Sequence, residues 1–173
     1  IMNYITNPDI SRYKLDIESV ECPEIYITNK DKTESALYVD VFNCSRENAV
    51  EQMIATQYEK GKSHRVDGIL AYHLVQSFKD FETTPDIAHQ CGVELVQRLF
   101  ADRFQVVLAT HVDKDHLHNH IIFNAVSFTD GYKYRNQFKD YFGDIRGISD
   151  QICREHCLYV IEDPKHKGMS YIE

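Results

Sequence analysis

The sequence lacks the features that mark membrane and secreted proteins. No apolar run approaches the length of a membrane-spanning helix, and no secretory signal peptide is visible. The five cysteines are odd in number and include no CxxC pair. This usage argues against a disulfide framework and fits a reducing cytoplasm.

Basic residues are in deficit. Lys and Arg number 19 against 27 Asp and Glu, which gives a formal net charge of −8. The balance argues against a protein that coats nucleic acid through bulk charge, but it leaves room for a local basic groove. KGKSHR at 60–65 and YKYRNQFK at 132–139 could supply one, although a solvated surface is the alternative for each.

No internal repeat, low-complexity tract or Pro/Gly/Ser-rich linker divides the chain. Its 173 residues, of which 43% are hydrophobic and 27% charged, suit one globular domain with a real core. We therefore expect a single domain over 1–173. Because the first residue is Ile1 and not methionine, we expect native residues upstream.

Hydrophobic periodicity predicts alternating strands and helices. Strands are expected at 25–28, 37–42, 68–78, 104–111, 118–128, 132–136 and 158–161. Helices are expected after the N-cap candidates Ser45 and Thr84, and over about 144–157. Short connections between neighbouring strands imply an antiparallel sheet with helices packed on it, so the predicted class is α+β.

The segment HVDKDHLHNHIIFN at 111–124 holds four histidines and two aspartates. On a strand, His118 and His120 point to one face together with His116, while Asn119 points to the other. His118 and His120 lie roughly 7 Å apart along such a strand, so both imidazoles can reach one ion. If the strand that ends at His111 pairs with this one in a hairpin, His111 joins them.

Three neutral imidazoles from two rigid strands form a metal site with open coordination positions, as catalytic sites do. Asp113 and Asp115 could orient an imidazole through its second nitrogen, or could be polar turn residues. By ligand type, three histidines suit Zn, Mn, Ni or Co better than Mg. Such centres serve hydrolases, oxygenases and lyases, so the spacing alone does not name a reaction.

Three segments in order resemble the motifs of a known family. NYITN at 3–7 resembles a first motif with a nucleophilic tyrosine, here Tyr4. HLVQSF at 73–78 resembles a second motif whose serine, here Ser77, contacts DNA near the cut. HVDKDHLHNHIIFN resembles the third, metal-binding motif. The sequence thus looks like the nuclease domain of conjugative relaxases, in the P-type mobilisation class of the HUH endonuclease group.

The resemblance implies roles for individual residues. The metal ligands are His111, His118 and His120, and the family is generally described with Mg or Mn. His116 and Asp113 are the candidates for accepting the phenol proton. The fold implied is a central antiparallel sheet with flanking helices, HUH endonuclease/relaxase-like and Rep-like. Relatives carry a strand and part of a helix before the tyrosine, so we expect these and any C-terminal region to be missing here.

The implied activity is site- and strand-specific cleavage of single-stranded DNA at a transfer origin, through a covalent 5′-phosphotyrosine. Accessory relaxosome and secretion-coupling proteins in a bacterial cytoplasm are the implied partners. DNA contacts are expected from Ser77, Asn124, Lys133, Tyr134 and Arg135, helped by Tyr132, Phe138 and Lys139. The alternatives are an HUH replication initiator or transposase-like nuclease, another histidine-metal phosphodiesterase, or a non-catalytic DNA-binding remnant.

Overall fold

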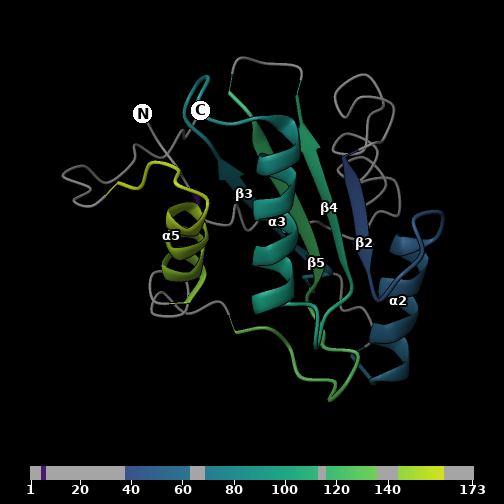
Figure 1. Cartoon of the computed structure of the whole chain (residues 1–173). Coiled ribbons are helices and arrows are strands. Elements are labelled where there is room, and N and C mark those ends of the chain that lie inside the picture. The colour runs from purple at the N-terminus through teal and green to yellow at the C-terminus, as the bar shows by residue number, and fades with distance from the viewer. Residues whose placement is uncertain (1–4, 7–37, 63–68, 113–115, 136–143, 162–173) are drawn as a thin grey trace, which may run out of the picture.

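The computed structural model describes residues 5–6, 38–62, 69–112, 116–135 and 144–161. Within these ranges the strands form a five-stranded sheet in the order β1-β3-β5-β4-β2 (Figure 1). Each strand runs antiparallel to its neighbours. The strands are β1 (Ile5–Thr6), β2 (Val39–Phe42), β3 (Ala71–Ser77), β4 (Val106–His111) and β5 (His118–Asn124).

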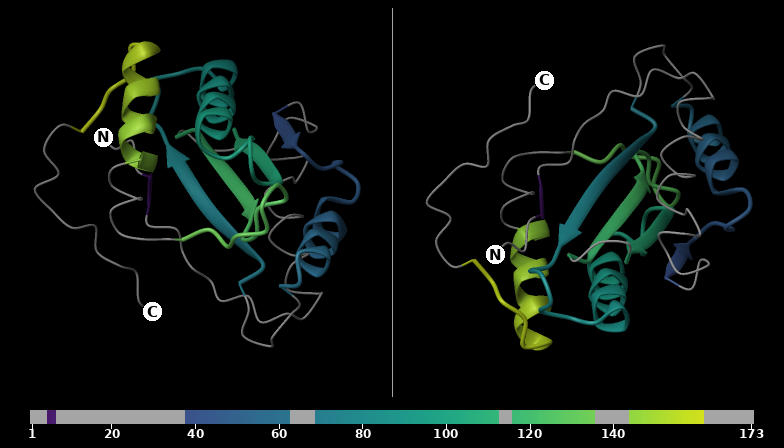
Figure 2. Two further views of the ribbon diagram at one scale, coloured as in Figure 1. Left: turned by 90° about the horizontal axis from the view of Figure 1, so that it is seen from below. Right: turned by 90° about the horizontal axis from the view of Figure 1, so that it is seen from above.

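Helices cover both faces of this sheet (Figure 2). They are α2 (Ala49–Glu59), α3 (Pro85–Leu99) and α5 (Arg146–Glu155). The predicted α+β class is therefore confirmed. No helix within the described ranges is long and apolar enough to cross a membrane.

The larger core lies on the face that we call the back face, which carries Leu74, Leu108 and Ile121. These side chains pack against α3 and α5 and are at most 1% exposed. The opposite, front face has a smaller core, in which Ala49 and Met53 of α2 cover strand residues. The two helical layers bury alternate residues of β3, β4 and β5, as strand alternation requires.

The register of the sheet aligns the ends of three strands. His118 at the start of β5 lies opposite Ser77 at the end of β3 and opposite His111 at the end of β4. Two residues further along β5, His120 lies opposite Val75 and Ala109. β4 and β5 therefore form the antiparallel pair that was predicted to bring His111 beside His118 and His120.

One of the two predicted N-cap residues is confirmed and the other is wrong. Thr84 caps α3 by accepting a hydrogen bond from the Ile87 amide at 3.4 Å, and proline follows at the first helical position. The N-cap position of α2 is occupied by Asn48, whose side chain makes no capping hydrogen bond, and not by Ser45. Ser45 instead closes a turn, in which its carbonyl accepts from the Asn48 amide at 3.3 Å.

Two predicted strands are not formed. Residues 158–161 do not join the described sheet. The Leu158 amide donates to the Cys153 carbonyl at 2.7 Å and Cys157 has φ 57°, a turn that ends α5. Of the second segment, 132–136, the structure describes 132–135, in which Lys133 makes only an isolated bridge to Val126; Gly131, just before this segment, has φ 72°. The strand expected at 25–28 lies outside the described residues.

Candidate metal centre

Three histidines converge on the front face where β4 ends and β5 begins. His111, His118 and His120 each offer a ring nitrogen, and these nitrogens lie within 4.8 Å of one another. The ring centroid of His111 is 5.0 Å from that of His118 and 4.3 Å from that of His120. The alternation on β5 and the pairing with β4 therefore produce the convergence that the sequence analysis expected.

The donor set fits a metal ion. His111 is 1% exposed and His120 8%, while His118 is half-buried. Three imidazoles are fewer protein ligands than a closed structural site uses, and they match the ligand number of catalytic sites. Since β3, β4 and β5 contain no Lys, Arg, Asp or Glu, their own side chains offer no formal charge to a ligand unless a histidine is protonated.

Two of the three imidazoles are oriented by contacts at Nδ1. Nδ1 of His118 is 3.3 Å from the backbone carbonyl of His116. Nδ1 of His120 is 2.7 Å from Nε2 of His73 on β3. His73 is the first residue of the second motif, HLVQSF, and no role was predicted for it. Alternation along the strand places His73 on the same face as Ser77, which the sequence could show. Its contact with His120 could be found only from the register of β3 and β5.

Of the other residues predicted to lie near the cut, the structure describes Ser77 and His116. Ser77 lies on β3 directly across from His118. His116 is exposed, and its ring centroid is 5.5 Å from that of His118. Tyr4, Asp113 and Asp115 lie outside the described residues, although Ile5, which follows Tyr4 in the chain, pairs with Gln76.

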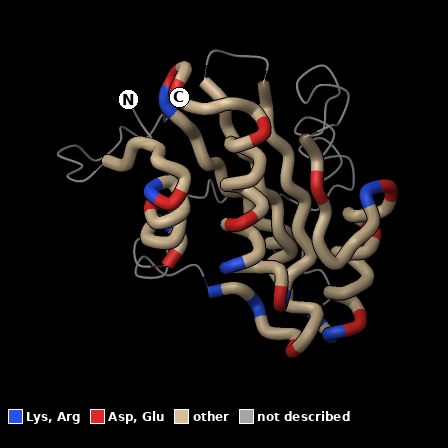
Figure 3. The backbone as a smooth tube through the Cα atoms, viewed as in Figure 1, with Lys and Arg blue, Asp and Glu red and all other residues tan. Residues whose placement is uncertain are grey.

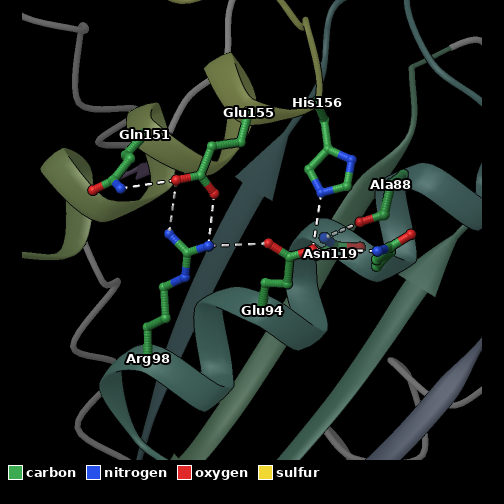
Figure 4. A network of polar contacts seen from close by, with 8 residues as sticks. Ala88, Glu94, Arg98, Asn119, Gln151, Glu155 and His156 are labelled. Atoms are coloured by element: carbon green, nitrogen blue, oxygen red, sulfur yellow. Dashed lines mark hydrogen bonds and ion pairs between the residues drawn. The ribbon is translucent and has the colours of Figure 1, made fainter.

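Asn119, between the two β5 histidines, points to the back face as expected from alternation. It is completely buried. Its Oδ1 accepts from the Thr110 hydroxyl at 2.6 Å, and its Nδ2 donates to Gln76 Oε1 at 2.9 Å. The Nδ2 atom also donates to the Ala88 carbonyl at 2.7 Å (Figure 4). Every hydrogen-bonding atom of this amide group has a partner, which is why a polar side chain is tolerated there.

The hydrogen bonds around Asn119 continue across the back face. The Thr110 hydroxyl is 2.8 Å from Nδ1 of His89. The other ring nitrogen of His89, Nε2, is 3.2 Å from the Asp40 carboxylate. On the other side, the Gln76 amide donates to the Ser149 hydroxyl at 2.9 Å. The network therefore ties β2, β4, β5 and β3 to α3 and α5, directly behind the histidines.

Asn124 does not belong to the candidate metal centre. It lies at the far end of β5, six positions from His118 and thus roughly 20 Å along the strand. Its amide group is completely buried and bonds the Met53 carbonyl, Gln57 and Gln105. These contacts attach α2 to the sheet, so the burial gives no support to a direct DNA contact by Asn124.

The basic-aromatic segment that follows β5 also lies at that far end. Tyr134 packs its ring against Tyr72, Phe104 and Phe123 of the back-face core. Lys133 and Arg135 are exposed. Figure 3 shows Lys and Arg interspersed with Asp and Glu over the described chain, away from the strands that carry the histidines.

Ion pairs fasten α3 to α5 behind the sheet (Figure 4). Arg98 contacts Glu155 at 2.6 Å and Glu94 at 3.3 Å, and Glu94 also meets His156 at 2.9 Å. The hydrogen bond from Arg98 is the main reason why the pKa of Glu155 is lowered. Beneath these surface pairs, burial raises the pKa of the Cys91 thiol to about 12, so it stays protonated at neutral pH.

The fold and the site together define a class: an α+β domain whose antiparallel sheet presents three histidines from its central strands. Residues 26–158 match the family described as Relaxase: MobA/VirD2-like, nuclease domain. This match covers most of the chain, and the chain belongs to that family. The family expected from the three sequence motifs is confirmed.

Relatives with curated names agree with this assignment. A protein from Staphylococcus aureus named Protein rlx is 41% identical over 120 residues, which are 69% of this chain and 36% of the relative. A second protein of that name and species is 36% identical over 138 residues, 80% of this chain and 39% of the relative.

A more distant relative is the Group II intron-interrupted relaxase LtrB of Lactococcus lactis subsp. cremoris (strain MG1363). It is 31% identical over 132 residues, 63% of this chain and 23% of the relative. The chain thus spans well under half the length of these relatives.

Proposed function

We propose that this domain nicks single-stranded DNA at a transfer origin and stays joined to the cut strand through Tyr4. The proposal follows from membership of the relaxase nuclease-domain family. The observation that carries it further is the convergence of His111, His118 and His120 within 4.8 Å. Two of these histidines, His111 and His118, lie in one register row with Ser77. In a cell, accessory relaxosome proteins and secretion-coupling proteins would act with it in the bacterial cytoplasm.

The three histidines would hold a divalent metal ion, which would supply positive charge beside the scissile phosphate. The site needs this positive charge from a metal, because the strands that build it have no Lys or Arg. Mg or Mn is expected from the family, whereas imidazole ligands suit Mn, Zn, Ni or Co better than Mg. Mn satisfies both arguments, so it is the first metal to test.

Tyr4 is the proposed nucleophile. A phenol loses its proton only near pH 10 in water, so Tyr4 needs a base, and His116 or Asp113 is our candidate. The phenolic oxygen attacks the phosphorus while the bond from phosphorus to the 3′ oxygen breaks. The leaving oxygen takes up a proton as a 3′-hydroxyl, and the phosphate stays on Tyr4 as a 5′-phosphotyrosine ester that can be reversed.

The sheet register supports this placement of the nucleophile. Ile5, the neighbour of Tyr4 in the chain, pairs with Gln76, one residue from Ser77. Ser77 in turn lies opposite His118. We propose Ser77 as a contact to the DNA strand near the cut. Lys133, Tyr134 and Arg135 lie beyond the far end of β5, so any contact that they make is with DNA distant from the scissile phosphate.

The test is a covalent-adduct assay with Mn²⁺ and a labelled single-stranded oligonucleotide. The oligonucleotide carries the transfer origin of the mobile DNA that encodes this chain. The wild-type chain is expected to give a slower-migrating band on a denaturing gel, and Tyr4→Phe none. The matched control is Tyr58→Phe, because Tyr58 is 61% exposed on α2 and lies outside the site.

The other outcomes separate the alternatives. An adduct that persists at full yield in Tyr4→Phe shows that Tyr4 is not the nucleophile. Cleavage without any phosphotyrosine in mass spectrometry indicates a phosphodiesterase that uses water. Oligonucleotide binding with no metal binding and no cleavage indicates a non-catalytic DNA-binding remnant.

A further inference from the structure

A fourth histidine contacts the candidate metal centre from the neighbouring strand. His73 lies on the front face of β3, and its Nε2 is 2.7 Å from Nδ1 of His120. In the register His73 lies opposite Ile122 and His120 lies opposite Val75, so the two imidazoles meet diagonally across the strands. His73 is separate from the three residues whose nitrogens converge, and it acts on one of them.

The geometry is that of a hydrogen bond between ring edges. The two ring planes are 18° apart and the ring centroids are 4.9 Å apart. Rings stacked face to face keep their atoms in van der Waals contact, which is longer than 2.7 Å, so the rings must meet edge to edge. Because a neutral imidazole has one N–H and one lone pair, one nitrogen donates and the other accepts.

Metal binding would require one of the two directions of this hydrogen bond. A neutral imidazole that gives one lone pair to a metal carries its proton on the other nitrogen. Nδ1 of His120 faces His73, so a metal would bind Nε2 of His120 and Nδ1–H would donate to Nε2 of His73. His73 then carries its own proton on Nδ1.

The second ligand on β5 shows the same orientation with a different partner. Nδ1 of His118 is 3.3 Å from the backbone carbonyl of His116. A backbone carbonyl is an obligate acceptor, and no side-chain substitution removes it. His73 can be replaced, so the contribution of an orienting partner can be measured at His120 alone.

We propose that His73 is a positioning residue of the metal centre. It accepts the hydrogen bond from Nδ1 of His120, holds that imidazole in the Nδ1–H tautomer and directs Nε2 toward the metal. A carboxylate or a carbonyl commonly fills this role, and its loss typically lowers metal affinity by roughly 10–100-fold. The inference rests on the three-histidine metal site of the proposed function.

The first test reads the tautomer without metal. In the metal-free, ¹⁵N-histidine-labelled chain, two-bond proton–nitrogen correlations should show His120 protonated at Nδ1, although free imidazole side chains in water favour Nε2–H. His73→Leu should return His120 to Nε2–H. His73→Gln keeps an acceptor in its amide oxygen and should preserve Nδ1–H. A wild-type spectrum with His120 at Nε2–H overturns the proposal.

The second test measures affinity for Zn²⁺ or Co²⁺ by titration of the purified chain. His73→Leu should bind roughly 10–100-fold more weakly than wild type, and His73→Gln should recover most of the loss. The matched control is His156→Gln, because His156 is a half-buried histidine that contacts Glu94 behind the sheet. Wild-type affinity in His73→Leu contradicts the proposal.

Failure of the metal site itself is distinguishable. If the wild-type chain binds none of the tested metals, the three-histidine site of the proposed function is wrong, while the His120 tautomer still decides whether His73 orients it. If His73→Leu does not fold by circular dichroism, the wild-type tautomer and His73→Gln decide.

Discussion

The first three residues of β5 all have polar side chains, but the side chains on the two faces of the sheet have different surroundings. His118 and His120 point to the front face, where they converge with a third histidine within 4.8 Å. Asn119 points to the back face, where each polar atom of its amide is hydrogen-bonded within the protein. The same strand segment therefore combines a ligand site with a structural anchor.

The contrast between Asn119 and the two histidines shows how a structural polar residue can be told from a ligand-binding one. A buried amide whose donors and acceptor all have protein partners stabilises the fold, and its removal leaves those partners unpaired. Imidazoles that direct nitrogens toward one point are arranged for a shared cation. Removing a front-face residue should thus weaken ligand binding, while removing the back-face residue should weaken the fold.

The largest effect is expected from His118→Leu. This variant lacks one of three metal ligands, so its Zn²⁺ affinity should fall by more than the roughly 10–100-fold that an outer hydrogen-bond partner contributes. Its thermal unfolding should stay close to wild type, because His118 is half-buried and not part of the back-face network. Retained metal affinity would show that His118 is not a ligand.

The matched variant one residue along, Asn119→Leu, should behave in the opposite way. It removes the partner of the Thr110 hydroxyl and of the Gln76 carbonyl oxygen in the buried interior. We expect the free energy of unfolding to fall by about 1–3 kcal/mol, measured by urea denaturation. Metal affinity should persist wherever the variant is folded. Unchanged stability would contradict the structural role of the network.

Gly92→Ala tests the same anchor from the helix side. An added Cβ would lie 2.6 Å from Asn119 Nδ2 and 2.9 Å from Leu108 Cδ1, so α3 or the amide must shift. Overpacking of this kind costs about 1–3 kcal/mol, and the better helix propensity of alanine offsets about 1 kcal/mol of it. We expect a net loss near 1 kcal/mol in the same denaturation series. Gly147→Ala is the control, because nothing lies within 4 Å of its added Cβ.

The smallest effect is expected from Arg98→Ala, which removes a surface ion pair between α3 and α5. Its stability should lie within error of wild type near neutral pH, since exposed pairs contribute little. The sign of the pH dependence is fixed by the lowered pKa of Glu155. The pair stabilises the fold above the unfolded-state pKa of Glu155, and this contribution is lost as the pH falls through the folded-state pKa. Arg98→Ala should therefore lose slightly less stability than wild type on acidification.

Much of the sheet could be predicted because strand alternation is a local property. The apolar runs of β3, β4 and β5 and the Thr84-Pro85 start of α3 were recognisable from residue types alone. Strand ends were less predictable. Lys133 makes only a bridge and residues 158–161 make no strand, because pairing depends on which neighbouring edge is available.

The site shows the same division. Motif order and alternation identified His111, His118 and His120, and the family match supports the class of protein that these motifs indicated. Alternation could not separate Asn124 from a ligand-facing residue, because its burial depends on α2, which lies far away in the sequence. Tyr4 remains a prediction from the motif.

By itself, the sequence determined the faces of β5: a period of two residues forces His118 and His120 to one side and Asn119 to the other. Only the tertiary structure decided what each face meets. The β4–β5 register placed His111 opposite His118, the β3–β5 register brought His73 to His120, and α3 with its neighbours enclosed Asn119. These contacts join residues far apart in the chain, so they depend on how strands pair and helices pack, which no local pattern encodes.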